Sequence, residues 1–456
     1  MASRRDLILL LPIVGIALLL RIWGIGFGLP FTYHPDEHQY VDTALGFLGG
    51  DLNPHRFNNP ALFKYLLAAL YALWYLIGRG LGAFESVAAF QSWATADPTP
   101  VYLLARLTSA LLGTATVAIT YGLGRLAYDG RTGLLAATLL AGTFLHARDS
   151  HYAVNDVPAT FFVTMALFFS LRVLQRGRLQ DYGLAGLCAG LATATKYTGL
   201  LLLVPLLLAH LLAGGARPRD RAARLASRWL LAGLGAFVGA YLLGAPYSVL
   251  DWPAFLADLK TLMIRGSTGF KGLQLDPASG WLFYLKTLLW GMGLPLALAS
   301  ILGVLVALIR HRRQDLVLVA FPLILYLYMG RQLLIFARFL IPALPVLTLL
   351  AARTVWLAVE RLPGGEGGQA VAVGVVAVVL LFQPVLDTVR HDYLLTRTDT
   401  RTLAKAWIEA NIPNGAKIIT QPNGPELAGA DGHAPRSRRT YDLTVAGTTS
   451  LYKRPL

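Results

Sequence analysis

Apolar runs alternate with short polar connections from about residue 7 to residue 388. A run of roughly 20 apolar residues lets a helix cross a bilayer, and the shorter runs must extend into their connections or lie in water-filled space lined by protein. The runs cover approximately residues 7–29, 101–126, 133–147, 157–174, 182–195, 198–213, 229–249, 281–309, 315–329, 336–356 and 369–388. The pattern predicts an all-α polytopic membrane protein, a bundle of about eleven transmembrane helices.

Composition supports this class, because 55% of the 456 residues are hydrophobic, 14% are charged and the mean hydropathy is +0.55. These values are typical of a membrane protein rather than of a large soluble core. Arg4 and Arg5 resemble the start of a signal peptide, but the apolar run after them is too long and lacks a small-residue cleavage site, which predicts a retained first helix. Cys188 is the single cysteine, which excludes an intrachain disulfide and a thiolate metal site.

The net charge of +15 comes largely from short basic clusters between the apolar runs. Such clusters mark cytoplasmic loops, which argues against nucleic acid as a partner. The clusters are Arg4/Arg5, Arg125/Arg131, Arg172/Arg176/Arg178, Arg217/Arg219/Arg221/Arg224/Arg228, Arg310/Arg312/Arg313 and Arg353/Arg361. They predict an integral protein of the cytoplasmic (inner) membrane, surrounded by membrane lipids, with its N-terminus inside and its C-terminal segment outside.

Residues 61–82 are also apolar enough to cross, but a crossing there would reverse the side of every later basic cluster. We therefore predict a re-entrant or surface-lying helix within a long external loop at 30–100. A second external loop, at about 250–280, is placed so that it can cover the first. The chain then divides into a transmembrane domain at 1–388 and an extracytoplasmic segment at 389–456. In that segment, a helix at 398–411 and a strand at 416–420 indicate a small α/β element.

This topology places several charged residues on the external side. Asp36 and Glu37 follow the first run, in the stretch Tyr33-His34-Pro35-Asp36-Glu37. Ionisable residues at the end of a membrane span are costly to desolvate and mark a functional site by default. The other external residues are His151, Tyr152, Asn155 and Asp156 before one run, Lys196 between two short runs, and Arg331 and Arg338 before another.

Carboxylates beside cations at membrane level suit a sugar carried on a lipid phosphate. Arg and Lys would neutralise the phosphate at the interface, and more strongly as negative charge grows on it. The carboxylates would act either as a general base toward an acceptor hydroxyl or as ligands for a divalent ion such as Mg²⁺ or Mn²⁺, with Glu37 and Asp156 as the candidate ligands. Since no nucleotide-binding motif is present, no other cofactor is expected.

These stretches resemble the GT-C glycosyltransferases of the family 39 type, which include protein mannosyltransferases and aminoarabinose transferases. The resemblance rests on the Asp-Glu pair, the stretch from Gly50 to Pro60, Asn155-Asp156-Val157-Pro158, Thr195-Lys196 and the stretch from Arg338 to Pro345. The order of these motifs and their common side carry the resemblance, since each is short. It implies a GT-C bundle whose transmembrane domain is catalytic and uses a polyprenyl-phosphate sugar as donor.

By position, the resemblance implies that Asp36 is the catalytic base, that Glu37 supports it or binds a metal, and that Asp156 is the second acidic residue. Lys196 and Arg338 would face the lipid phosphate. The chain departs from the family at Asn58-Asn59-Pro60-Ala61, where relatives carry a charged residue before two prolines. This departure weakens the case for a metal ligand at that point. It also weakens the case that Lys64 is equivalent to the family's lysine.

Simpler interpretations stand beside these roles. Asp156 is also a suitable N-cap for the helix that follows it. His151 and Tyr152 suit the interfacial depth where aromatic residues collect, and Lys196 suits a side chain that reaches out to water. Arg331 and Arg338 suit structural counter-ions. His34, His38 and His55 fit no recognised metal spacing and are expected to be solvated loop residues.

The sequence thus predicts a glycosyltransferase that moves a hexose or pentose from a polyprenyl-phosphate donor to an acceptor on the extracytoplasmic face, with inversion at the anomeric centre. The alternative is a transporter or flippase of a lipid-linked anion, in which the same charges line a path. The clustering of the charges at one surface, and the lack of an inverted repeat, favour the transferase.

Overall fold

The computed structural model describes residues 4–213, 227–269, 279–363, 365–420, 424–429 and 439–445. Part of the fourth basic cluster and part of the second external loop lie outside the described residues. The affected side chains are Arg217, Arg219, Arg221, Arg224, Lys271 and Asp276. The described part is almost entirely helical, as the hydrophobic pattern predicts.

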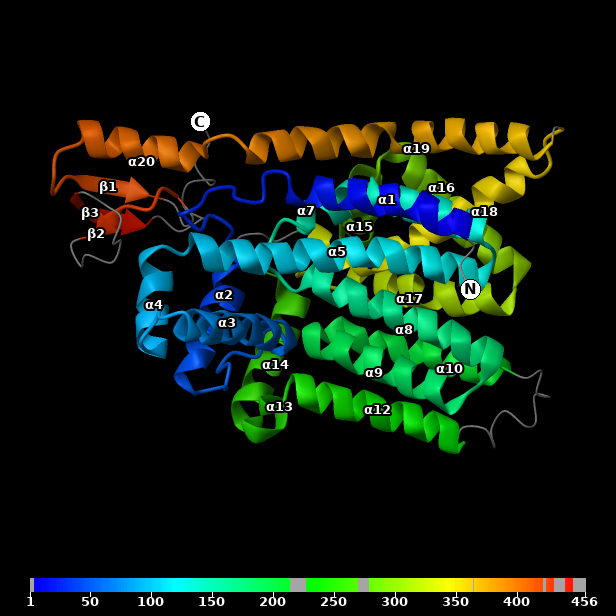
Figure 1. The fold of residues 1–456 in the computed structure, drawn as a ribbon, viewed down its shortest axis with the longest axis horizontal. Coiled ribbons are helices and arrows are strands. Elements are labelled where there is room, and N and C mark those ends of the chain that lie inside the picture. The colour runs from blue at the N-terminus through cyan, green and yellow to red at the C-terminus, as the bar shows by residue number, and fades with distance from the viewer. Residues whose placement is uncertain are drawn as a thin grey trace.

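Long helices lie side by side and form a bundle (Figure 1). Its helices are α1 (Arg4–Ile22), α5 (Thr99–Ala127), α6 (Gly130–Ala141), α7 (Phe144–Asp149), α8 (Asp156–Arg176), α9 (Leu179–Thr195), η2 (Tyr197–Leu202), α10 (Leu203–Leu212), α12 (Arg228–Gly244), α15 (Ser279–Met292), α16 (Leu294–Arg310), α17 (Arg313–Gly330), η4 (Ala337–Ala343), α18 (Leu344–Val359) and α19 (Glu366–Leu395). Local sequence sets some of the boundaries: the Asp129 carboxylate accepts a hydrogen bond from the Thr132 backbone N–H at 2.7 Å and begins α6.

Glycines let two of these helices approach closely. A Cβ at Gly186 of α9 would lie 1.9 Å from the Gly233 carbonyl oxygen of α12, and one at Gly190 would lie 2.3 Å from the Phe237 carbonyl oxygen. In a lipid environment, where the hydrophobic effect does not drive helices together, such close backbone packing stabilises a helix pair. The Gly233-Leu234-Gly235 stretch therefore provides a helix contact and not a nucleotide-binding loop.

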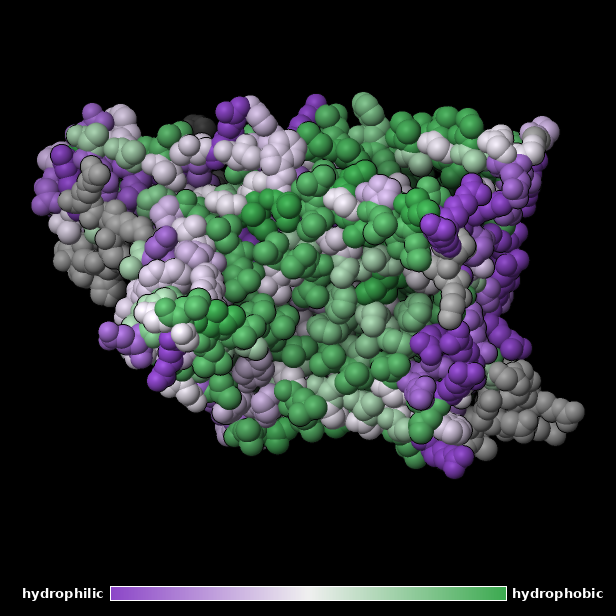
Figure 2. Space-filling view, viewed as in Figure 1, coloured by the Kyte–Doolittle hydropathy of each residue, from purple (hydrophilic) through white to green (hydrophobic). Residues whose placement is uncertain are grey.

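An apolar band crosses the middle of the surface, with polar residues at both ends of the bundle (Figure 2). Large apolar side chains stay exposed on the outer helices: Leu243 is 82% exposed, Phe382 70% and Val378 67%. Water would make such a continuous surface costly, whereas lipid does not. The protein is therefore an integral membrane protein.

Six helical segments among the described residues are long and apolar enough to cross a membrane: Leu62–Gly80, Thr99–Ala127, Asp156–Arg176, Arg313–Gly330, Ala337–Val359 and Glu366–Asn411. Two of the predicted runs are broken. The run at 281–309 divides at Gly293, whose φ of 78° ends α15 before Pro295, and the run at 133–147 divides between α6 and α7. The number of eleven crossings stays a prediction.

The first external loop folds into α2 (His38–Gly46), η1 (Phe47–Gly49), α3 (Leu62–Gly80) and α4 (Val87–Ala96), which gather at one end of the bundle (Figure 1). One face of α3 is buried through Phe63, Leu67 and Tyr71, while Leu76 and Ile77 on its other face are more than half exposed. An apolar face that stays exposed at the end of a bundle suits a helix lying in the membrane interface. Its surface-lying position remains a prediction.

The second external loop contains α13 (Tyr247–Leu250) and α14 (Trp252–Thr268) and contacts the first loop. The Asn53 amide donates to the Asp251 carboxylate at 2.7 Å, and the Phe57 backbone N–H donates to the Asp258 carboxylate at 2.6 Å. The two loops therefore contact each other, as expected from their predicted position on the same side of the membrane.

The C-terminal segment packs beside the same end. It contains α20 (Thr400–Asn411), capped by Asp399, and three parallel strands in the order β1-β3-β2: β1 (Lys417–Thr420), β2 (Ala428–Gly429) and β3 (Thr440–Val445). The helix and the first strand lie where the sequence predicts them. Because α19 continues to Leu395, the predicted division at residue 388 falls inside a helix.

Candidate active site

Two carboxylates and two cations from distant parts of the chain form one cluster at the loop-covered end. Arg338 lies 2.8 Å from the Asp36 carboxylate and 3.6 Å from the Asp156 carboxylate. The Lys196 ammonium contacts Asp156. Asp156 is almost completely buried, whereas about a quarter of the Asp36 side chain remains exposed. The structure thus brings together four of the predicted site residues, with Asp36 as the accessible carboxylate.

Helix ends hold this cluster in place. Asp156 is the first residue of α8, and Lys196 follows the last residue of α9 in an extended conformation, with φ of −153°. Asp156 caps nothing, since its oxygens face Lys196 and Arg338 and no side-chain cap is formed at Asn155. The N-cap interpretation is therefore wrong, although a carboxylate at a helix N-terminus is still stabilised by the helix dipole.

Asn155 joins the two helix ends. Its side-chain amide donates to the Thr195 carbonyl at 2.7 Å and to the Asn59 side-chain oxygen at 3.3 Å. Asn155 is 2% exposed, so it positions its neighbours and offers little surface to a substrate.

Glu37 points away from Asp36 into the protein. Its two oxygens accept from the Arg106 guanidinium at 2.8 and 2.7 Å, and one also accepts from the Ala153 N–H at 2.8 Å. Neither side chain of this pair is exposed. Arg106 also donates to the Ile25 and Phe27 carbonyls. The prediction of Glu37 as a metal ligand does not fit this geometry, and its role is to support the loop that carries Asp36.

The remaining candidates lie outside the cluster. His151 is fully buried, with its ring nitrogens near the Ala147 and Trp23 carbonyls, so it is no interfacial anchor. The Tyr152 ring stacks on His34, with centroids 4.5 Å apart. Arg331 follows α17 and is exposed, and no ion pair joins it to the cluster within the described ranges.

An apolar cavity of about 530 Å³ opens beside Lys196. Its walls come from η2, α12, α14 and α17, with Phe255, Leu259 and Leu262 from the second external loop. Phe339, which faces the Lys196 ammonium at 4.3 Å, also lines it. Burial lowers the pKa of Lys196 below its usual 10.5, although Asp156 opposes the shift. The cavity therefore combines a long apolar surface with one cation, as a lipid phosphate requires.

A second, polar cavity of about 250 Å³ lies on the other side of Asn58 and Asn59, which line both cavities. Its wall includes Lys64, Arg56 and Asp42. Lys64 is 4% exposed, and its ammonium has a single long contact, 3.5 Å to the Arg56 carbonyl. Lys64 therefore belongs to this cavity and not to the cluster around Asp156.

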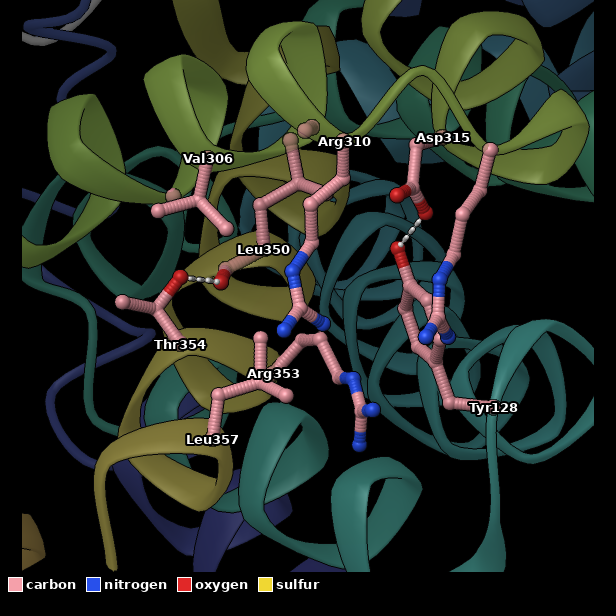
Figure 3. Close-up of a pocket in the computed structure, with 11 residues that line it drawn as sticks. Tyr128, Val306, Arg310, Asp315, Leu350, Arg353, Thr354 and Leu357 are labelled. Atoms are coloured by element: carbon pink, nitrogen blue, oxygen red, sulfur yellow. Dashed lines mark hydrogen bonds between the residues drawn. The ribbon is translucent and has the colours of Figure 1, made fainter. Parts of the chain in front are cut away.

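The opposite end of the bundle carries the basic connections, and the pocket described there is small. A pocket there, with Arg310 and Arg353 beside the hydrogen-bonded pair Tyr128 and Asp315 (Figure 3), has a volume of about 10 Å³. That volume is about enough for one water molecule. The substrate-sized cavities therefore lie at the loop-covered end.

Comparison with known proteins agrees with this architecture. Residues 100–243, from α5 to α12, match the family model of dolichyl-phosphate-mannose-protein mannosyltransferases. The crystal structure of the Archaeoglobus fulgidus oligosaccharyltransferase superposes with a TM-score of 0.60 at 15% identity, over 90% of this chain and 59% of that one. ArnT from Cupriavidus metallidurans, bound to undecaprenyl phosphate, superposes with a TM-score of 0.58 at 14% identity, over 91% of this chain and 83% of ArnT. The chain has the GT-C fold.

The GT-C fold is shared by proteins that are longer than this chain. A protein of Aquifex aeolicus described as uncharacterized is 26% identical over 201 residues, which is 42% of this chain and 34% of that protein. The chain likewise spans about three fifths of the archaeal oligosaccharyltransferase. The portion matched by the family model, residues 100–243, includes the α8 and α9 ends that carry Asp156 and Lys196.

Three features of this GT-C site escape the sequence pattern. Arg106 lies within an apolar run, and an arginine at such a position needs a buried partner. This need was the signal that could have pointed to its pairing with Glu37. Asn58 and Asn59 line both cavities. Because their side chains are uncharged, the sequence alone does not mark them as site residues. His391 and Asp392 lie at the end of α19 and contact His151 through the Asp392 carboxylate, at 3.1 Å from His391 and 3.4 Å from His151.

Proposed function

We propose that the protein is a membrane glycosyltransferase that uses a polyprenyl-phosphate sugar as donor. The observation that carries the proposal is the position of Lys196, which contacts Asp156 of the ion cluster and also lines the apolar cavity. The polyprenyl chain would occupy the apolar cavity, with its phosphate at Lys196 and Arg338 and its sugar toward Asp36. The archaeal oligosaccharyltransferase has been solved with a dolichol-phosphate and ArnT with undecaprenyl phosphate, which supports this class of donor.

In this proposal Asp36 removes the proton from the acceptor hydroxyl. The hydroxyl oxygen attacks the anomeric carbon while the bond to the phosphate oxygen breaks on the opposite face, so the configuration inverts. The proton goes to Asp36, and the polyprenyl phosphate leaves with the bonding electrons. Lys196 and Arg338 stabilise the negative charge that grows on the phosphate. The acceptor would reach Asp36 from the polar cavity on the external face of the inner membrane.

The predicted pair of metal ligands does not fit a divalent ion. Both oxygens of Glu37 are held by Arg106 and Ala153, and Asp156 already faces two cations. No step of the proposed mechanism therefore passes through a metal at these residues.

The test uses the purified full chain in lipid nanodiscs with radiolabelled undecaprenyl-phosphate hexoses and pentoses, with water as the acceptor hydroxyl, and it measures release of undecaprenyl phosphate together with the free sugar. We expect Asp36→Asn to lower release by about 10²–10⁴-fold, the usual contribution of a general base. The control is Asp51→Asn, a mostly exposed carboxylate of the same loop, which should retain activity. Folding of both variants is checked by thermal unfolding.

Full activity in a folded Asp36→Asn protein would overturn the assignment of the base. Movement of labelled lipid between leaflets without release of lipid phosphate would instead favour the transporter. The gathering of Asp36, Asp156, Lys196 and Arg338 in one cluster at the loop-covered end, rather than along the middle of the bundle, supports the transferase.

A further inference from the structure

A buried cluster outside the ion cluster has the form of a metal site. His151, His391 and Asp392 each bring one ligand-type atom to within 4.8 Å of the others. The Asp392 carboxylate oxygen lies 3.4 Å from His151 Nε2 and 3.1 Å from His391 Nδ1. When bonds to a tetrahedral ion are about 2.0–2.1 Å long, the ligand atoms stand about 3.4 Å apart. The two separations from Asp392 are close to this spacing.

The hydrogen bonds of the two rings suit metal ligands. His151 Nδ1 lies 3.0 Å from the Ala147 carbonyl, and His391 Nε2 lies 3.2 Å from the Tyr152 hydroxyl. A histidine that binds a metal through one nitrogen usually donates the N–H of the other to such an oxygen, which fixes the orientation of the ring. In this arrangement each ring is left with an unprotonated nitrogen, and both of these nitrogens face Asp392.

In these tautomers the nitrogens and oxygens at the centre of the cluster are all acceptors, whereas the other tautomer of His391 would donate its Nδ1–H to Asp392 at 3.1 Å. His151 Nε2 faces the Asp392 carboxylate and also the Trp23 carbonyl, 3.1 Å away. Asp392 is fully buried, and its second oxygen has no hydrogen-bond partner among the described atoms. A His151 ring protonated on both nitrogens would supply a donor, but the positive charge of this fully buried ring is costly. A bound cation satisfies all of these groups at once.

Arg21 interacts electrostatically with Asp392, but its guanidinium forms its hydrogen bonds elsewhere. It donates to the Ala17 and Ala141 carbonyls at 2.8 and 3.3 Å, and it lies 2.9 Å from the His146 ring. The negative charge of Asp392 is therefore available to an ion. The His391 side chain is 18% exposed and provides a route from solvent.

We propose that His151, His391 and Asp392 bind one zinc-class transition-metal ion, with the Trp23 carbonyl or a water molecule in the fourth position. A set of two imidazoles and one carboxylate favours Zn²⁺ over Mg²⁺ and Ca²⁺. The ion joins the segment after α1, the connection between α7 and α8, and the end of α19. It is a structural clamp, because among the described residues the cluster is linked to Asp36 indirectly, through Tyr152 and the ring of His34 stacked on it.

The experiment measures zinc in the full-length protein, purified without chelators, by inductively coupled plasma mass spectrometry. We expect one Zn²⁺ per chain, and at least a tenfold loss of zinc affinity in His391→Ala and in Asp392→Asn. The control is His311→Ala, an exposed histidine at the basic end of the bundle, which should keep the metal. Retention of zinc by both cluster variants would overturn the proposal.

A second measurement uses only the wild-type chain, in case a variant fails to fold. Removal of the metal with a chelator should lower the thermal unfolding midpoint, and Zn²⁺ should restore it. Co²⁺ in place of Zn²⁺ should give the visible absorption of a tetrahedral site. Wild-type protein that binds no stoichiometric Zn²⁺ would refute the site. Because metal content is read without sugar transfer, this outcome is independent of the proposed enzymatic activity.

Discussion

Asp36 and Glu37 are adjacent in the chain, yet their carboxylates have different partners. Asp36 faces Arg338 near the cavities, whereas Glu37 is buried against Arg106. Their neighbouring positions do not distinguish them, because the partner of each carboxylate lies far away along the chain. The accessible carboxylate is suited to chemistry, and the buried one to holding the loop.

Lys196 provides a test at the same scale, based on its lowered pKa. Only the ammonium form binds phosphate well. Burial lowers the pKa of Lys196 below its usual 10.5, so this form loses its proton at a lower pH than a free lysine does. Above about pH 7 the phosphate no longer changes charge. Affinity for undecaprenyl phosphate should therefore fall as the pH rises from 7 to 10.

The matched variants separate this effect from a general loss of structure. Lys196→Arg stays charged over the whole range and should show no such fall. Lys196→Ala should bind at least tenfold more weakly than wild type at pH 7, and this difference should narrow as the pH rises. Affinity is measured by titration of the lipid into protein in nanodiscs. Identical pH profiles for wild type and Lys196→Arg would rule out Lys196 as the titrating group.

At the scale of elements, helix ends and one buried ion pair position the site. The ends of α8 and α9 present Asp156 and Lys196, and Asn155 joins them. The loop with Asp36 is attached to α5 by Arg106, which is hydrogen-bonded to Glu37 and to two backbone carbonyls. Removing one partner of such a pair leaves a buried charge without compensation.

Arg106→Met should therefore destabilise the protein by about 3–5 kcal/mol. The measurement is the thermal unfolding midpoint in detergent micelles, which should fall by several degrees. Arg131→Met is the control, because Arg131 pairs with Glu366 on the exposed surface and its loss should leave the midpoint unchanged. Equal midpoints for the two variants would contradict the anchoring role of Arg106.

At the scale of the whole molecule, the two ends of the bundle differ in structure. One end carries the external-loop helices and the C-terminal segment (Figure 1), and residues of the loops line the two cavities. The other end carries the basic connections. The distribution of arginine predicts that the basic end faces the cytoplasm. The site would then open on the external side of the membrane. Nucleotide-sugar donors are not available on that side.

Cysteine labelling tests this orientation. In a chain carrying Cys188→Ala, a membrane-impermeant maleimide should label Asp51→Cys in intact cells, since Asp51 is exposed at the loop-covered end. Arg313→Cys, exposed at the basic end, should react only after the membrane is opened. Labelling of both positions from the same side would exclude the proposed topology.

The sequence by itself determined the class of the protein, the helical bundle and the shared end of the main charged residues. Hydrophobic length and the distribution of basic residues act locally, so they can be read without a structure. Asp36, Asp156, Lys196 and Arg338 were found in this way, and they do meet.

Only the tertiary structure decided which charges pair with which. It buried Glu37 against Arg106, brought His391 and Asp392 to His151, and opened an apolar and a polar cavity on either side of Asn58 and Asn59. The physical reason is that the energy of a charge depends on its burial and its nearest partners. Both are set by how helices far apart in the chain pack together.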